Sequence, residues 1–486
     1  MQQIFRKLRE RSAYKLFRNT LLYGIGDLLQ KFLAILLIPI YTKFLEPSDY
    51  GVLALLSIFI MVISTLATCG LTNGISRYFY YSETENATKA EVIWSPMAFV
   101  FILSTILVAG LFFFSERLSI LLFDNPAFAH LVNLTLFNVL ILNISSISRT
   151  VLVVEEKVWQ INCVNIIGVI VGVISGVVCV VHLQRGVQGA VEAGVIASII
   201  MAGMLWYFAM PKYEFAFNSR ILKRQLRYSL PLTAAVFAFF LIDSSDRFLL
   251  KQFLPLSEVG LYNIGYQGGM IMMLLVGGFT TAWPPYYHKN NQNGEGQLIC
   301  SKVLNLYLPV ACIFAVMISL SAPLALRLMT PHTYFEAYTV VPFVAMAYML
   351  KGPYLIFMMG VLMKEKTTWQ LSLEAVAAGL NIGLNILLIP LIGREAAAIT
   401  TLFSYGLMVF GAYLMVRRIN PIPGLHLIKI AGGVLICFLL ASTVFIPGYS
   451  KASWWIVILA VLFCGAALAW WCKCQIANLN SEAEAL

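Results

Sequence analysis

The sequence predicts an all-α polytopic membrane protein, with about 14 transmembrane helices in two parallel-repeat lobes around a central cavity. Composition, the length of the apolar runs and an internal repeat lead to this fold class. Of the 486 residues, 60% are hydrophobic and 12% are charged, whereas a soluble domain carries about 25% charged residues. Apolar runs of twenty or more residues recur, as helices that cross a bilayer require. A soluble domain and an outer-membrane barrel, whose strands alternate every second residue, are therefore excluded.

Windows of about twenty residues give fourteen candidate spans with short connections between them. The basic stretch before the first span looks like the start of a signal peptide. However, the apolar run that follows, 21–41, is too long for one and contains charged residues, so we expect it to be retained. The expected spans are 18–41, 50–72, 93–114, 129–153, 160–183, 187–209, 229–250, 258–282, 302–325, 336–362, 368–391, 395–417, 427–447 and 453–472.

The distribution of Lys and Arg predicts the orientation of these spans. With the N-terminus in the cytoplasm, the inner segments hold 22 basic residues and the outer segments hold 7. Cytoplasmic loops carry the excess of positive charge in membrane proteins. We therefore expect a multi-pass protein with both termini in the cytoplasm.

An internal repeat joins the two halves of the chain. Segment 44–51 and segment 253–260 match in residue type at five positions, Phe, Leu, Ser, an acid and Gly, at a constant offset of 209. Six spans separate the copies, so the halves share one orientation and are related by an axis along the membrane normal. Chance similarity in a chain rich in Gly and Leu is the alternative.

This repeat predicts the domain organisation. A basic segment between the halves is expected to lie as a short amphipathic helix on the cytoplasmic leaflet, where it would meet anionic phospholipids. A plain linker that follows the positive-inside rule is the alternative. The predicted parts are an N-terminal lobe at 1–210, this linker at 211–228, a C-terminal lobe at 229–418, and two further spans with a cytoplasmic tail at 419–486.

Ionisable residues inside the expected spans are candidates for lining a water-filled cavity, because a charge in lipid costs about 2.5–3.5 kcal/mol. Asp27 and Lys31 lie four residues apart in the span that opens the first half. Asp243 and Arg247 repeat this spacing in the span that opens the second half, with Asp246 beside them. Mutual neutralisation of each pair is the alternative.

Further basic residues lie at other depths. Lys351 is expected at the middle of its span, directly before Gly352 and Pro353, where the helix should kink and free backbone carbonyls at a cavity. Arg77 and Arg149 lie near inner span ends and are candidates for guarding a cytoplasmic mouth. Snorkelling of these two side chains to the interface is the alternative.

Together these residues predict a cationic route for an anionic cargo such as a phosphate or pyrophosphate. The acids would balance the charge or couple an ion, and Glu192 and Glu374 are further intramembrane acids of this kind. The candidate substrate-binding cations are Arg77, Arg247, Lys31, Lys351 and Arg149, and the candidate acids are Asp27, Asp243, Asp246, Glu192 and Glu374.

Other functions find no support in the residues. The chain has no G-x-x-x-x-G-K-[ST] motif for ATP, and its five histidines form no metal set, so we expect no cofactor and no metal. The basic residues are scattered over short loops, which argues against nucleic acid. The longest outer loop, 115–128, is too poor in charged residues for a membrane transferase. An enzyme is therefore not expected.

Several segments resemble those of a known group of transporters. Segment 38–51, IPIYTKFLEPSDYG, follows the first span, and segment 70–78, GLTNGISRY, closes the second. Segments 246–262, 282–285 and 360–367 match landmarks of the second half. In this order and spacing they resemble the polysaccharide transporters, the O-antigen-type lipid-linked oligosaccharide flippases of the multidrug/oligosaccharidyl-lipid/polysaccharide exporter superfamily.

The resemblance implies fourteen helices and a cavity lined mainly by helices one, two, seven and eight. It implies alternating access that moves an undecaprenyl-pyrophosphate-linked glycan across the bacterial inner membrane, for O-antigen, lipopolysaccharide, exopolysaccharide or capsule synthesis, beside a polymerase and a chain-length regulator. The pyrophosphate-binding role would fall on Arg77 and Arg247, then on Lys31 and Lys351. The alternatives are a multidrug or cation antiporter of the same superfamily and a flippase for the peptidoglycan lipid precursor.

Overall fold

A computed structural model shows the fold. It describes residues 37–80, 87–290, 296–364, 367–419, 421–422 and 427–446, and every regular element in these ranges is a helix. Ten of the helices are long and apolar enough to cross a bilayer. The protein is therefore a multi-pass helical membrane protein, as the sequence predicts. The expected span 453–472 and most of the span 18–41 lie outside the described residues, as do Asp27 and Lys31.

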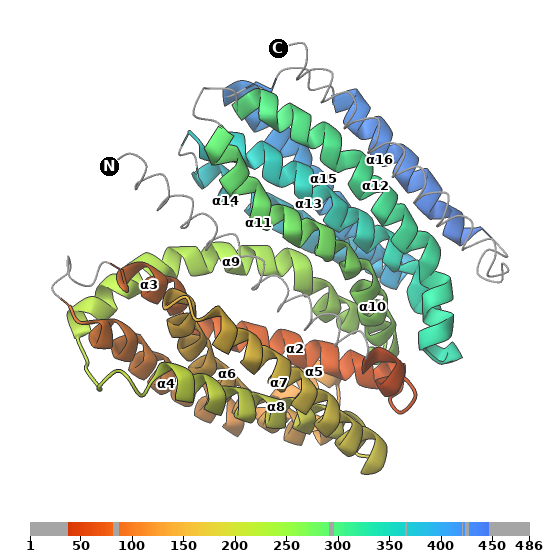
Figure 1. The fold of residues 1–486 in the computed structure, drawn as a ribbon. Coiled ribbons are helices and arrows are strands. Elements are labelled where there is room, and N and C mark those ends of the chain that lie inside the picture. Colours follow the sequence, from red (N-terminus) through yellow and green to blue (C-terminus); the bar gives the residue numbers. More distant parts are fainter. Residues whose placement is uncertain are drawn as a thin grey trace, which may run out of the picture. The chain divides into compact units, whose positions relative to one another are not determined.

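The chain divides into two compact units, residues 1–237 and 238–486. In the first unit α6 lies in the middle and packs against α2, α4 and α8, while α7 packs on α8 (Figure 1). The helices of this unit are α2 (Pro47–Thr68), α3 (Leu71–Tyr78), α4 (Lys89–Phe113), α5 (Ser115–Phe123), α6 (Ala129–Val154), α7 (Val158–Gly176) with a π-helical end η2 (Val177–His182), and α8 (Gly186–Ala209).

In the second unit α13 takes the central place. It packs against α10, α11, α12 and α15, and nearly all of its side chains are buried. Helix α9 (Ser219–Phe253) leads into this unit. The others are α10 (Leu256–Gly269), α11 (Met273–Asn290), α12 (Gly296–Met329), the 3-10 segment η5 (His332–Thr339), α13 (Val341–Leu362), α14 (Thr367–Ile392), α15 (Arg394–Ile419) and α16 (Leu427–Ser442).

The helix starts repeat along the chain. Helices α2 and α10 begin 209 residues apart, as do α7 and α14, while α8 and α15 begin 208 apart and α6 and α13 begin 212 apart. The two central helices, α6 and α13, thus occupy corresponding places. Two copies of one helix set would produce this spacing, which matches the offset of the sequence motifs.

Local signals explain where individual helices begin and end. Helix α2 starts with a capping box between Glu46 and Asp49 around Pro47. It ends at Thr68, short of the expected Thr72, because Cys69 and Gly70 both adopt positive φ. A side chain at Gly70 would also place its Cβ 2.2 Å from the hydroxyl oxygen of Thr233.

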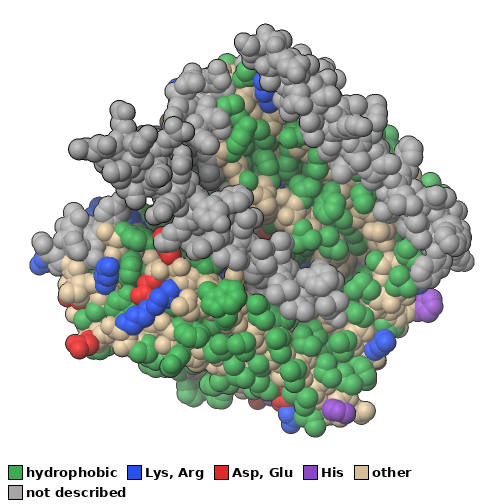
Figure 2. All heavy atoms as spheres, in the orientation of Figure 1, with side chains coloured by type: hydrophobic (Ala, Val, Ile, Leu, Met, Phe, Trp, Pro, Cys, Tyr) green, Lys and Arg blue, Asp and Glu red, His purple; other side chains and the backbone are tan. Residues whose placement is uncertain are grey.

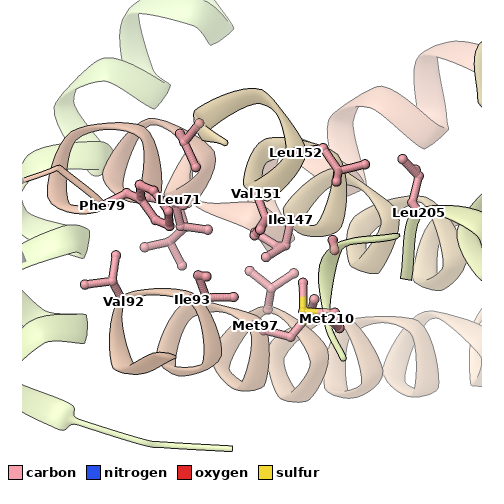
Figure 3. Packing of buried hydrophobic residues seen from close by; sticks show 14 of the residues in the cluster. Leu71, Phe79, Val92, Ile93, Met97, Ile147, Val151, Leu152, Leu205 and Met210 are labelled. Carbon is pink, nitrogen blue, oxygen red and sulfur yellow. The ribbon is translucent and has the colours of Figure 1, made fainter. Parts of the chain in front are cut away.

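The core of the first unit joins α3, α4, α6 and α8. Figure 3 shows Leu71 and Phe79 facing Val92 and Ile93, with Ile147 beside them. All five side chains are at most 5% exposed. Full burial of such side chains contributes about 1.5–3 kcal/mol each, which holds the end of α3 in place.

Hydrophobic side chains also cover much of the outer surface. Large apolar residues of α4 are half exposed, among them Phe101, Ile102 and Ile106, and Leu387 and Leu391 of α14 are more so. Figure 2 shows broad hydrophobic areas on the described part of one face. Surfaces of this kind are expected to face lipid in a membrane protein.

Two expectations about connections differ from the structure. The predicted outer loop 115–128 is largely helical, because α5 buries Leu122 and Phe123 and is followed by a short 3-10 turn. The predicted linker 211–228 does not contain a helix of its own. From Ser219 on, it forms the first turns of α9, which continues through Pro231, because Ile221 and Leu222 of these turns are part of the core of the first unit.

Candidate functional site

A polar cluster in the second unit centres on Asp246 of α9, which is fully buried. Its Oδ2 accepts hydrogen bonds from the hydroxyls of Tyr262 on α10 (2.6 Å) and Thr401 on α15 (2.9 Å). Its Oδ1 accepts a hydrogen bond from the amide of Asn385 on α14 (3.0 Å). Three helices thus place neutral donors around a carboxylate of a fourth helix, as a buried acid requires.

Amide and hydroxyl groups extend this cluster along α14 and α15. The oxygen of Asn385 accepts a hydrogen bond from the hydroxyl of Thr400 (2.5 Å), and its amide also donates to Asn381 (3.1 Å). The amide nitrogen of Asn381 is buried and has no hydrogen-bond partner among the described residues. The surroundings of Asp246 are therefore rich in oxygen atoms.

Arg247 lies directly beside this acid but does not pair with its carboxylate. Its Nε donates to the side-chain oxygen of Asn263 (3.1 Å), and its Nη1 donates to the backbone carbonyl of Asp243 (2.9 Å). Its guanidinium lies 4.2 Å from the centre of the Tyr266 ring and 5.7 Å from that of Tyr262. The cation is thus oriented by neutral groups and aromatic faces.

Asp243 and Lys351 complete the cluster. The carboxylate of Asp243 accepts a hydrogen bond from the hydroxyl of Tyr405 (2.9 Å), and Lys351 of α13 is near enough to act on its charge. The hydroxyls of Tyr266 and Tyr348 share a hydrogen bond of 2.7 Å beside them. The alternative of a neutralising pair between Asp243 and Arg247 takes an indirect form, because Arg247 donates its hydrogen bond to the backbone carbonyl of Asp243.

The turn around Pro353 corrects a further expectation. Pro353 has no N–H to offer the carbonyl of Met349 one turn earlier. That carbonyl does not open to a cavity, because the hydroxyl of Tyr307 on α12 donates to it (3.2 Å). Gly352 makes room for this contact, since a Cβ there would lie 2.1 Å from the tyrosine ring. The freed carbonyl is therefore satisfied inside the protein.

Glu374 of α14 lies outside this cluster in a separate buried contact. Its Oε1 accepts hydrogen bonds from the hydroxyl of Tyr354 (2.6 Å) and from the amide of Gln370 (2.9 Å). The side chain is 6% exposed. It remains a candidate acid for charge balance or coupling, now with two named donors.

The candidate residues of the first unit lie at three separate contacts. Arg77, in the last turn of α3, is exposed, and its guanidinium stacks 4.5 Å from the centre of the Tyr228 ring on α9. Arg149 of α6 is half-buried and donates to the oxygen of Asn165 on α7 (3.3 Å). Of the two, Arg77 is the one placed for contact with a ligand from outside the protein.

Glu192, the third candidate residue of the first unit, was expected to balance charge or to couple an ion, and it forms an ion pair. It lies in the second turn of α8 and pairs with Arg185 (2.6 Å) just before that helix. Gln188 donates to its other oxygen (2.8 Å). The carboxylate is thus neutralised near the start of the helix, because a separation of seven residues, about two helical turns, brings it to the same side as the arginine.

An ion cluster that the sequence reasoning missed joins the ends of α6, α7 and α8. Glu155 contacts Lys212 (2.5 Å) and Lys157 (3.1 Å), and the hydroxyl of Tyr213 donates to it (2.6 Å). Burial disfavours the charged form of Glu155, but these three donors outweigh burial and hold the pKa of Glu155 below its usual value. The cluster therefore clamps two connections of the first unit.

A second missed cluster surrounds Arg394 at the start of α15. Its Nη1 and Nη2 donate to Glu258 (2.7 Å) and Glu336 (2.8 Å). Its Nε lies 3.3 Å from Glu395, whose carboxylate also accepts from the hydroxyl of Thr339 (2.7 Å). One arginine thus ties together α10, η5 and α15. Glu258 is the acidic residue of the repeated motif, so the repeat offered a signal for it.

The tyrosines and amides of the Asp246 cluster were also missed. Tyr262 and Tyr266 lie four residues apart, as do Asn381 and Asn385, so each pair shares a helix face. That spacing was the available signal. Which helices would meet could not be inferred from it.

Comparison with known structures shows which fold this chain has. A lipid II flippase MurJ in an inward closed conformation superposes with a TM-score of 0.71 at 13% identity, over 92% of this chain and 98% of that chain. An inward-facing multidrug resistance transporter of the MATE family, from the MOP superfamily, gives a TM-score of 0.64 at 15% identity, over 81% of this chain and 95% of that one. The fold is that of MOP-superfamily transporters.

Sequence comparison then gives the family. A family model described as polysaccharide biosynthesis protein matches residues 16–291, more than half of the chain. The chain belongs to this family, and its fold is the one that MOP-superfamily transporters share. A relative from Haemophilus influenzae, Lsg locus putative protein 1, is 21% identical over 281 residues. That match covers 57% of this chain and 66% of the relative, slightly under two thirds of its length.

Proposed function

We propose that this transporter is a flippase for undecaprenyl-pyrophosphate-linked oligosaccharide units. It would move them by alternating access from the cytoplasmic to the periplasmic leaflet of the bacterial inner membrane, with both termini in the cytoplasm. The product would serve O-antigen, exopolysaccharide or capsule synthesis. The family described as polysaccharide biosynthesis protein supports the pathway, and the shared fold of a protein named lipid II flippase supports a lipid-linked cargo.

The observation that carries the proposal is the burial of Arg247 together with its hydrogen-bond partners. It is buried within a membrane helix bundle, yet among the described residues no carboxylate contacts its guanidinium. Asp246 and Asp243 use their carboxylates on hydroxyl and amide donors instead. Burying a cation without a direct ion pair costs free energy, and an anionic ligand that binds the cation would offset this cost. A pyrophosphate supplies the oxygens that a guanidinium binds best.

The driving force fits an anionic cargo. With the cytoplasm negative, outward movement of each negative charge is favoured by about 2.3 kcal/mol per 100 mV. The lipid tail stays in the bilayer while the head group crosses, so the transporter only has to shelter the polar head. Asp246 would balance the charge of Arg247 and Lys351 or bind a coupling ion in its oxygen-rich surroundings.

Asp246 also favours a second candidate, the cation antiporter. A fully buried carboxylate among hydroxyl and amide groups suits exchange of H⁺ or a monovalent cation. In that case everted membrane vesicles should accumulate a cationic dye when an H⁺ or Na⁺ gradient is imposed. A flippase for lipid-linked glycan predicts no such uptake.

The gene deletion tests the proposal directly. Deletion should leave lipid-linked repeat units on the cytoplasmic side and remove the surface glycan, and the wild-type gene should restore it. Lysis with blocked cell-wall synthesis would instead indicate the peptidoglycan precursor as cargo. Normal surface glycan in the deletion strain would contradict the proposal.

Complementation with variants tests the residues. Arg247→Ala and Lys351→Ala should each reduce surface glycan while the protein still inserts into the membrane. Lys43→Ala is the matched control, because this lysine is exposed in a connection between spans. Full complementation by both Arg247→Ala and Lys351→Ala would show that these residues take no part in the mechanism.

A further inference from the structure

The start of α9 carries an unusual concentration of positive charge on one face. Four basic residues recur at positions i, i+3, i+4 and i+7, which lie along one side of a helix. Their side chains are exposed, and no acidic residue occurs from 215 to 242. We name them the basic stripe: Arg220, Lys223, Arg224 and Arg227.

The opposite face of these turns is fixed to the protein. Ile221 is 1% exposed, Leu222 is buried as well, and Gln225 is fully buried. The amide of Gln225 donates to the backbone carbonyl of Val92 on α4 (3.0 Å). The helix face that carries the stripe is therefore held in one orientation by packing on its other side.

The first turn of α9 is also tied down. The side-chain oxygen of Asn218 caps the helix by accepting from the backbone N–H of Arg220 (3.0 Å). The backbone N–H of Asn218 donates to the hydroxyl of Ser95 (2.9 Å), and its amide donates to Glu91 (3.2 Å). The stripe is thus part of a rigid surface and not of a free linker.

Helix α9 is longer than the hydrocarbon core of a membrane, so its first turns can lie outside that core. The helix has 35 residues, or about 52 Å at 1.5 Å per residue, whereas the hydrocarbon core is about 30 Å thick. Its apolar part follows the stripe. Phe215 and Phe217, just before the helix, are 69% and 53% exposed, and exposed aromatic side chains of this kind prefer the membrane–water interface.

We propose that the basic stripe binds the head groups of anionic phospholipids in the cytoplasmic leaflet. The charge is complementary, the surface is preformed, and neighbouring aromatic side chains can enter the interface beside it. Bound lipid would hold the start of α9 at the head-group level and so set the depth of the same helix that carries Asp246 and Arg247. Lipid binding by the stripe requires that the start of α9 lies on the cytoplasmic side, as the distribution of Lys and Arg predicts. It does not depend on which molecule the protein transports.

A lipid-binding measurement on the full-length protein tests this. Purified protein would be titrated with phosphatidylglycerol or phosphatidylcholine and the retained lipid counted by native mass spectrometry. The variant is Arg220→Gln with Lys223→Gln. The matched control is Lys43→Gln with Arg117→Gln, which also removes two exposed positive charges, one from the turn before α2 and one from α5.

The wild type should retain phosphatidylglycerol in preference to phosphatidylcholine, and each lost cation of the stripe should weaken this binding about fivefold. The control should bind as the wild type does. The preference should shrink in 1 M salt, where the Debye length falls from about 10 to about 3 Å.

Three results would overturn the proposal: no preference for the anionic lipid, equal loss in the control, or binding of undecaprenyl pyrophosphate to the stripe in place of phosphatidylglycerol. The last result would make the basic stripe a binding site for the transported lipid. Because the readout is phospholipid binding, failure of glycan transport in a separate assay leaves this test unaffected.

Discussion

Replacing Arg247 by Gln should weaken binding of the pyrophosphate head group by at least tenfold. The structure sets the size of the effect. Two of the three guanidinium nitrogens are used inside the protein, on Asn263 and on the carbonyl of Asp243, and Nη2 makes no hydrogen bond within the described part of the chain. A phosphate oxygen would therefore gain about one charge-assisted hydrogen bond, worth about 1.5–3 kcal/mol. That corresponds to a roughly 10- to 150-fold change in affinity.

The assay is titration of purified protein in nanodiscs with undecaprenyl pyrophosphate. Arg247→Lys keeps the charge but loses the planar fork, so its affinity should lie between those of the wild type and Arg247→Gln. Lys43→Gln is the surface control, and thermal unfolding of each variant checks that the fold is kept. Affinity of Arg247→Gln within twofold of the wild type, at an unchanged melting temperature, would refute the reasoning.

Three further predictions concern stability, each measured by thermal unfolding in detergent. Gly352→Ala should lower the free energy of unfolding by about 1–3 kcal/mol through overpacking against Tyr307. Gly379→Ala, whose new methyl group meets open space, should change it little, and equal shifts in melting temperature for the two variants would contradict this. Arg394→Ala should lower the free energy of unfolding by about 1.5–3 kcal/mol, because the carboxylates around it lose charge-assisted hydrogen bonds. An unchanged melting temperature would show that Arg394 does not stabilise the contact of α10, η5 and α15. Since the pKa of Glu155 is lower in the folded state than in the unfolded chain, its contribution is complete above about pH 4.3 and is lost as the pH falls through the folded pKa. Glu155→Gln should therefore flatten the loss of stability on acidification, and an identical pH profile would be inconsistent with this.

The sequence was sufficient to predict an all-helical multi-pass membrane protein and most helix positions among the described residues, because long apolar runs have few other solutions in a membrane. Expected spans such as 129–153 and 187–209 agree with α6 and α8 within one residue at each end. Errors occurred where backbone geometry decides. Cys69 and Gly70 break a span that hydropathy alone runs on to Thr72, and hydropathy does not register positive φ.

The candidate site was predictable only in part. The charges on α9 were found because a charged residue in an apolar run is conspicuous. Their partners were not, because tyrosine and asparagine are ordinary residues in a sequence and gain meaning only when four helices bring them to Asp246. The same holds for the alternative of a pair between Asp243 and Arg247, since the hydroxyl of Tyr405 donates to the carboxylate while Arg247 donates to the backbone carbonyl.

Water accessibility of the predicted cationic route tests the central claim most directly. In a variant free of native cysteines, cysteine would replace Lys351, and labelling by an anionic, membrane-impermeant thiol reagent would be measured in everted and in right-side-out vesicles. Leu380, which is 39% exposed on the outer surface of α14, is the lipid-facing control position. The account predicts that position 351 is labelled, that undecaprenyl pyrophosphate protects it and that position 380 is not labelled. No labelling at 351 from either side, or labelling that the lipid pyrophosphate leaves unchanged, would contradict it.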